Sequence, residues 1–193
     1  MAFSSTGVEE KAALLDIQFA THELENSSSP YNRSMRLAVL TVSDRCSQGL
    51  AADASGPAIV AFLRRTWPDA EIQAALVSDE IVEISDHLMK WSGQGLDLVL
   101  TTGGTGLGPR DWTPEATRRV IDREAPGIAE AMRAQGAESN PMAWLSRGVA
   151  GLIGKTLIIN LPGSPRGAEE SFAVILPLIR HGLETIAGAE THP

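Results

Sequence analysis

The chain has 193 residues, of which 43% are hydrophobic and 21% charged, and its formal net charge is −8 at pH 7. This length is enough to bury one sizeable core without dividing the chain into two domains. The negative charge argues against nonspecific binding of DNA or RNA, because such binding needs a basic face that neutralises phosphates. Any phosphate ligand must therefore be met by local groups.

Neither a membrane span nor a secretion signal is visible in the sequence. No apolar run approaches the roughly 20 residues that span a bilayer, and residues 1–30 lack a basic start followed by an apolar core. The single cysteine, Cys46, cannot form an internal disulfide, which fits a reducing compartment. We therefore expect a soluble cytoplasmic protein without a membrane partner.

The first 34 residues differ in character from the rest of the chain. They contain one weak helical pattern, followed at residues 26–30 by a polar, turn-prone run that is typical of a linker. We expect a partly disordered N-terminal extension over residues 1–34 and one folded domain over residues 35–190. An extension that docks on a partner is the alternative, and Met35 is a candidate natural start.

After the extension, apolar runs alternate with segments of helical character. The predicted strands are residues 37–42, about 71–77, 96–101 and 156–161. The predicted helices begin at 55, 81, 113, 127 and 168. Pro177 should kink or divide the last of them. This alternation predicts an α/β fold of three layers, with a mainly parallel sheet covered by helices on both faces.

Polar and glycine residues follow each predicted strand. They are Ser43-Asp44-Arg45, Ser78-Asp79, residues 103–111 and residues 162–166. Ligands of parallel sheets bind beyond the carboxyl ends of the strands, and we expect these four loops to converge on one edge of the sheet. The alternative is that they are merely solvated connections.

Residues 98–111 are the most informative stretch, because an apolar run leads into Gly103-Gly104-Thr105-Gly106 and closes on Arg110-Asp111. Glycines let backbone N–H groups approach an anion closely. The stretch therefore predicts a loop that binds the phosphate of a nucleotide or phosphorylated cofactor.

Neither standard nucleotide signature fits the chain. Residues 151–156 end like a Walker A loop, but Val149 stands where that motif needs a glycine, so Lys155 is interpreted as a turn residue. The dinucleotide fingerprint fails at Pro109, where it also needs a glycine.

Three loop aspartates accompany the glycine loop. Asp79 and Asp111 are the best candidates for Mg²⁺, which binds through one or two carboxylates together with phosphates and waters. Capping of the following helices is the alternative for both. Asp44 is a weaker candidate, since it could order its own turn.

Basic side chains are spread over several of these loops. Four arginines are candidate cationic clamps or, alternatively, solvated surface residues: Arg45, Arg110, Arg147 and Arg166. The histidines form no visible metal-binding pair and no dyad of base and nucleophile.

Six motifs in a fixed order resemble those of the molybdopterin adenylyltransferases, the MogA/MoaB-like proteins related to the G domain of gephyrin. They are Thr41-Val42-Ser43-Asp44-Arg45, residues 101–106, Arg110-Asp111, residues 113–117, Leu145-Ser146-Arg147 and residues 160–165. The resemblance covers about residues 37–187. It implies the MogA/MoaB-like α/β fold, a homotrimer, and Mg²⁺-dependent transfer of AMP from ATP to molybdopterin with release of pyrophosphate.

The resemblance also assigns roles to residues. It implies that Asp79 and Asp111 are the catalytic acids and the candidate Mg²⁺ ligands. The contacts to molybdopterin and nucleotide would come from Ser43, Asp44, Gly103, Gly104, Thr105, Gly106, Ser146, Arg147, Pro162, Gly163, Ser164 and Pro165.

Other functions remain open from the sequence. The same fold could serve a noncatalytic molybdopterin-binding or scaffold protein, and a generic nucleotide hydrolase is a weaker third hypothesis. A partner protein that inserts molybdate would act downstream, and the sequence does not decide between molybdenum and tungsten.

Overall fold

The computed structural model describes residues 34–188. The chain divides into two units, Met1–Asn32 and Arg33–Pro193, and the described residues all belong to the second unit. The predicted extension, apart from Ser34, and the end of the domain at residue 190 thus lie outside the described residues and stay predictions. Within the described part, no helix is both long and apolar enough to cross a membrane.

A six-stranded sheet in the order β2-β1-β3-β6-β5-β4 forms the middle layer. The four predicted strands are present, and they are parallel neighbours at one end of this order: β2 (Glu71–Val77), β1 (Arg36–Val42), β3 (Leu98–Thr102) and β6 (Thr156–Leu161). β1 and β6 match their predicted limits to within a residue, whereas β3 begins two residues later than predicted. The predicted mainly parallel sheet is confirmed.

Two short strands were not predicted. β5 (Ala150–Ile153) runs antiparallel to β6, and β4 (Arg123–Glu124) runs antiparallel to β5. Gly154 and Lys155 form the turn between β5 and β6, which confirms the interpretation of Lys155 as a turn residue. β5 gives little signal in the sequence because it is four residues long and contains a glycine.

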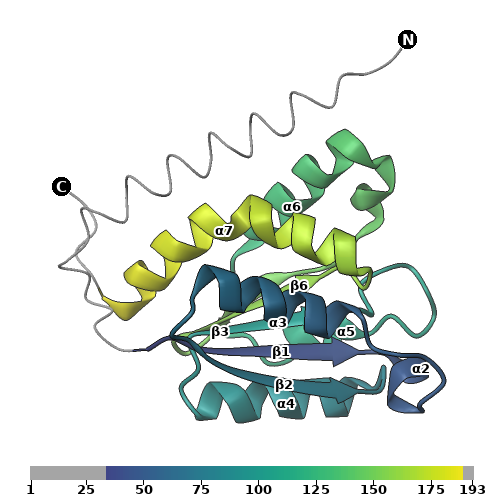
Figure 1. Ribbon diagram of the computed structural model, residues 1–193, viewed down its shortest axis with the longest axis horizontal. Coiled ribbons are helices and arrows are strands. Elements are labelled where there is room, and N and C mark those ends of the chain that lie inside the picture. The colour runs from purple at the N-terminus through teal and green to yellow at the C-terminus, as the bar shows by residue number, and fades with distance from the viewer. Residues whose placement is uncertain (1–33, 189–193) are drawn as a thin grey trace. The chain divides into compact units, whose positions relative to one another are not determined.

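Helices cover both faces of the sheet (Figure 1). α3 (Ser55–Thr66) and α7 (Pro165–Ala187) pack together on one face, and α6 (Pro126–Ser139) packs on α7. α4 (Ile81–Gly93) and α5 (Thr113–Arg118) pack together on the other face. This arrangement confirms the three-layer α/β fold. Two shorter elements complete it: α2 (Asp44–Ser47) and the 3₁₀ helix η1 (Pro141–Leu145).

Pro177 does not divide α7, which is a single helix of 23 residues. A proline inside a helix removes one backbone hydrogen bond. The apolar side chains of α7 are buried on both sides of Pro177: Phe172 and Ile175 lie before it, and Ile179 and Leu183 lie after it. Tertiary packing therefore carries the helix through the proline.

The core holds the central strands rigidly. Side chains of a strand point alternately to its two faces, and in β1 those of Ala38, Leu40 and Val42 join the cluster formed with Ile84 and Leu88 of α4. The alternate side chains of β1 are equally buried and face the layer of α3 and α7. Burial of each large aliphatic side chain contributes about 1.5–3 kcal/mol. The carboxyl ends of the strands are thus fixed points from which the loops project.

Candidate functional site

The parallel register brings the carboxyl ends of four strands to one edge of the sheet. Val42 of β1 pairs with Val77 of β2, and Thr102 of β3 pairs with Leu161 of β6. The loops that follow these strands therefore begin side by side, as expected for a site at the edge of a doubly wound sheet. The predicted convergence of the four loops is confirmed.

Two cavities open between these loops. The first, of about 350 Å³, is here called the aspartate cavity, and its lining includes the predicted residues Ser43, Asp79, Gly103, Gly104, Asp111, Gly163 and Pro165. The second, of about 910 Å³, is here called the large cavity, and its lining includes the predicted residues Gly104, Thr105, Gly106, Asp111, Ser146, Pro162, Gly163 and Ser164. The two cavities meet where Gly104, Asp111 and Gly163 line both.

Two predicted contact residues line neither cavity. The carboxylate of Asp44 is occupied by Asp79 and Arg110, and the guanidinium of Arg147 is occupied by the segment 106–111 and Glu115. Direct contact of Asp44 or Arg147 with a ligand stays a prediction.

The loop after β3 takes a shape that requires glycine. Gly103 and Gly104 have φ values of +100° and +62°, a region that is costly for residues with a Cβ atom. A Cβ on Gly104 would lie 2.4 Å from Thr113 Oγ1 and 2.9 Å from Asp79 Oδ1. The turn therefore brings the backbone of the loop directly against the carboxylate of Asp79.

The same turn exposes backbone donors. The N–H of Gly103 donates to the carbonyl of Leu161 at 3.4 Å. The N–H groups of Gly104, Thr105 and Gly106 donate to no other group in residues 34–188. Three adjacent free N–H groups are suited to an anion, so the structure fits a phosphate cradle made by residues 104–106.

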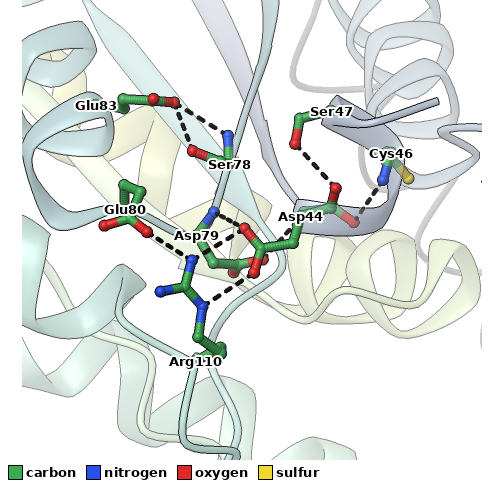
Figure 2. A network of polar contacts seen from close by, with 9 residues as sticks. Asp44, Cys46, Ser47, Ser78, Asp79, Glu80, Glu83 and Arg110 are labelled. Atoms are coloured by element: carbon green, nitrogen blue, oxygen red, sulfur yellow. Dashed lines mark hydrogen bonds and ion pairs between the residues drawn. The ribbon is translucent and has the colours of Figure 1, made fainter. Parts of the chain in front are cut away.

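A polar network joins the loops after β1, β2 and β3 (Figure 2). The backbone N–H of Asp44 donates to Asp79 Oδ2 at 2.7 Å, and that of Asp79 donates to Asp44 Oδ1 at 2.9 Å. Arg110 donates from Nε and Nη2 to the two carboxylate oxygens of Asp44, at 3.0 and 3.1 Å, and from Nη2 to Glu80 at 2.7 Å. A bidentate pair fixes orientation as well as charge, and this one fastens the glycine-loop segment to its neighbours.

The network shifts the two carboxyl groups in opposite directions. The hydrogen bonds from Arg110, together with the backbone N–H of Asp79, lower the pKa of Asp44. Burial raises the pKa of Asp79, and the neighbouring charges of Asp44 and Asp111 add to the rise. A perturbed carboxyl group in a cavity is a feature of functional sites.

Neither Asp79 nor Asp111 caps the helix that follows it, which removes the structural alternative for both. Glu80 and Trp112 occupy the N-cap positions of α4 and α5, without a capping side-chain hydrogen bond. Asp111 Oδ2 accepts the N–H of Gly108 at 2.6 Å. The other oxygen of each carboxylate has no hydrogen-bond partner in the described part of the chain.

The charged side chains that line the two cavities are all acidic. Asp53, Asp79 and Asp111 line the aspartate cavity and Glu138 and Glu170 line the large one, whereas no lysine or arginine of the described residues lines either.

The candidate cationic clamps are engaged elsewhere. Arg110, Arg147 and Arg166 form ion pairs with protein carboxylates. Only the side chain of Arg45, among these four, has no acceptor within residues 34–188. A role of these arginines in binding phosphate therefore remains a prediction.

Several lining residues were not predicted. Asp53 Oδ2 accepts the hydroxyl of Thr41 at 2.7 Å, and Oδ1 accepts the N–H of Gly56 at 3.0 Å. An aspartate three residues before a helical N–H is a helix-start pattern that could have drawn attention to it. The wall of the large cavity formed by α6, η1 and α7 gave no signal, because it depends on how these helices pack.

The chain matches known proteins along the part that carries this site. Residues 38–181 match the family described as probable molybdopterin binding domain. A molybdopterin adenylyltransferase of Helicobacter pylori is 40% identical over 158 residues, which cover 81% of this chain and 90% of that protein. The molybdenum cofactor synthesis protein cinnamon of Drosophila melanogaster is 39% identical over 79% of this chain, but the match spans only 26% of that protein.

Solved structures agree with the sequence matches. The molybdopterin biosynthesis enzyme MoaB of Thermus thermophilus superposes with a TM-score of 0.74 at 50% identity, over 80% of this chain and 97% of that one. The fold, the ordered motifs and the family match thus agree with the resemblance found in the sequence. This chain belongs to the family of molybdopterin-binding domains that includes the MogA and MoaB proteins.

Proposed function

We propose that the chain is a molybdopterin adenylyltransferase of molybdenum cofactor biosynthesis. An oxygen of the terminal phosphate of molybdopterin attacks the α-phosphorus of ATP. A new P–O–P link forms, the bond to the β-phosphate breaks, and pyrophosphate leaves. The Helicobacter pylori relative is named molybdopterin adenylyltransferase, and the match covers 90% of that protein, which supports this activity.

The observation that carries the proposal is the junction of the two cavities. Phosphoryl and nucleotidyl transfers depend mainly on positioning and on electrostatic stabilisation. Donor and acceptor phosphates must meet in line, and the place where Gly104, Asp111 and Gly163 border both cavities offers such a meeting point. The N–H groups of residues 104–106, which donate to no group of the described residues, are available to the oxygens of a phosphate held there.

The charge of the lining argues for a divalent cation with the nucleotide. A polyphosphate would be repelled by Asp79 and Asp111, since no basic side chain of the described part lines the cavities. The described residues hold no cluster of three or more metal-ligating side chains. Mg²⁺ needs only one or two carboxylates besides phosphate and water, and the uncommitted oxygens of Asp79 and Asp111 fit that requirement.

Each part of the site then has a role. Asp79 and Asp111 hold Mg²⁺, which when bound neutralises charge on the polyphosphate. The N–H groups of residues 104–106 bind the phosphate that reacts. Ser146 and residues 162–164 orient molybdopterin at the large cavity, and Pro165 contributes from the aspartate cavity.

The experiment is a pyrophosphate-release assay with ATP, Mg²⁺ and molybdopterin, using wild type, Asp79→Asn and Asp111→Asn. Loss of one electrostatic group commonly costs about 10²-fold in rate. We expect each variant to lose roughly that much while molybdopterin binding is retained. Release that is unchanged in both variants would overturn the assignment of the acids. Binding of molybdopterin by wild type without any pyrophosphate release would instead support a noncatalytic binding protein.

A further inference from the structure

Arg147 donates several hydrogen bonds to the segment that carries Asp111 and to Glu115, and we call this group of contacts the Arg147 hub. Its Nε donates to the carbonyl of Gly106 at 2.7 Å, and its Nη2 donates to the carbonyl of Asp111. Its Nη1 donates to Glu115. The backbone N–H of Arg147 also donates to the carbonyl of Thr105 at 2.9 Å. One residue therefore ties down both ends of the segment 106–111.

Glu115 completes this hub from α5. One of its carboxylate oxygens accepts from Arg147, and the other is buried without a hydrogen-bond partner within the described residues. The first residue of α5, Thr113, donates its hydroxyl to the carbonyl of Gly103 at 2.8 Å. The glycine loop is thus fastened to α5 at its start and to Arg147 along its remaining length.

We propose that Arg147 is a positioning residue that sets the backbone of residues 106–111, and through it the place of Asp111, and that Glu115 orients its guanidinium. The proposal rests on the proposed function for its effect on rate. Neither Arg147 nor Glu115 lines the two cavities. This role differs from the direct ligand contact that the sequence suggests for Arg147.

The shape of the guanidinium is what the hub uses. Its N–H groups form a planar fork that reaches several acceptors at once, whereas the ammonium of lysine is a compact point charge. A phosphate clamp that acts through its charge alone would keep much of its effect in a lysine variant. A positioning hub loses its geometry in the same variant, although the charge is unchanged.

Glu115 separates the two roles by the sign of its effect. If Arg147 bound phosphate, neutralising Glu115 would release the guanidinium for the ligand and improve the KM for ATP. If Arg147 positions the loop, the same change weakens the hub and lowers kcat.

The test compares Arg147→Lys and Glu115→Gln with a matched pair, Arg65→Lys and Glu169→Gln, which alters another arginine–glutamate pair, at 3.8 Å, outside both cavities. Since misplacement by about 1 Å can cost on the order of 10²-fold in rate, we expect kcat to fall roughly 10- to 100-fold in Arg147→Lys. Glu115→Gln should show a smaller fall, and KM for ATP should change little in either. The control pair should keep the wild-type kcat.

Hydrogen exchange without substrate at the amides of Gly108, Asp111 and Thr113, which donate to acceptors within this segment, gives a second readout that does not depend on the proposed function. We expect faster exchange of this segment in Arg147→Lys and Glu115→Gln than in the control pair. Wild-type kcat and exchange in Arg147→Lys, or an improved KM in Glu115→Gln, would overturn the positioning role. Faster exchange in a protein that transfers no AMP would support the hub and refute the proposed function. If Arg147→Lys does not fold, the sign of the effect in Glu115→Gln decides.

Discussion

Asp44 and Asp79 exchange hydrogen bonds with each other's backbone, yet their pKa values move in opposite directions. Arg110 holds the pKa of Asp44 down, whereas burial beside other carboxylates raises the pKa of Asp79. The charged form of Asp79 is therefore costly for the folded protein, while that of Asp44 is favourable. A destabilising charge kept inside a cleft is typical of residues retained for function rather than for stability.

This difference gives opposite predictions for two similar substitutions. The folded pKa of Asp79 lies above its ordinary value of 3.8, so the stability contributed by its protonated form is present below the unfolded pKa and lost as the pH rises through the folded pKa. Asp79→Asn should therefore raise the melting temperature at pH 7, by an amount that shrinks as the pH falls toward 4.

Asp44 should behave in the reverse manner. Its folded pKa is lowered, so its contribution is present above the unfolded pKa and is lost as the pH falls through the folded pKa. Asp44→Asn should lower the melting temperature at pH 7. Thermal unfolding of both variants at pH 7 and pH 4 checks the pair, and a lower melting temperature for Asp79→Asn at pH 7 would contradict the account.

Gly104 offers a second prediction at this scale, with Gly154 as its control. Both have positive φ, +62° and +58°, but a Cβ on Gly154 would meet nothing within 4 Å. Gly154→Ala bears only the cost of the left-handed backbone, about 1–2 kcal/mol. Gly104→Ala also drives a Cβ against Thr113 and Asp79.

We therefore expect Gly104→Ala to reduce the free energy of unfolding more than Gly154→Ala and to impair AMP transfer as well. Denaturant unfolding and the pyrophosphate assay measure the two effects. Equal reductions of the free energy of unfolding and of AMP transfer in the two variants would show that the close approach at Gly104 contributes to neither.

At the scale of elements, Asn160 joins β6 to β3 and α5. Its side-chain amide donates to Thr101 Oγ1 at 3.0 Å and to Thr117 Oγ1 at 2.9 Å, and its oxygen accepts the N–H of Val149 at 3.2 Å. Only 1% of Asn160 is exposed. Thr117 in turn donates to the carbonyl of Thr113, so the buried network reaches the helix that supports the glycine loop.

Asn160→Leu should therefore be strongly destabilising although the substitution is apolar and of similar size. It leaves the buried N–H of Val149 without its partner, at about 1–3 kcal/mol for such a group, and further hydroxyl partners are lost. We expect a loss of about 2–5 kcal/mol by denaturant unfolding. A stability equal to that of wild type would mean that the network is dispensable.

The elements differ in how well the sequence predicts them. β1 and β6 contain the apolar runs 37–40 and 157–159, and α4 shows Ile84, Leu88 and Trp91 at helical spacing, so each could be predicted from its own residues. β4 has only two residues and β5 four. These two form because β6 offers a free edge, which is a property of the fold rather than of their residues.

The same distinction holds for the site. Residues that directly follow strands, such as Asp79 and Gly104, could be predicted because the parallel topology gathers them. Asp53 and the wall of the large cavity could not, since they come from a longer connection and from helix packing. The place of Arg147 beneath the loop depends on which acceptors the folded segment presents, and the sequence alone contains no measure of that.

At the scale of the whole molecule, the structure brings loops from distant parts of the sequence to one acidic cleft. Its parallel strands carry the loops, and the acids in the lining are the reason that we propose a neutralising cation together with an anionic substrate.

A homotrimer is a further prediction at this scale, and it rests on the family resemblance. Size-exclusion chromatography with light scattering should give the mass of three chains. The mass of a single chain across the working concentration range would contradict it.

The central claim is that the cleft transfers AMP to molybdopterin. The most direct measurement uses ATP labelled in the α-phosphate or in the γ-phosphate, incubated with the chain, Mg²⁺ and molybdopterin. The account predicts that the α-label appears in the pterin product and the γ-label in pyrophosphate. An α-label recovered only as free AMP or ADP, with unmodified molybdopterin, would contradict it.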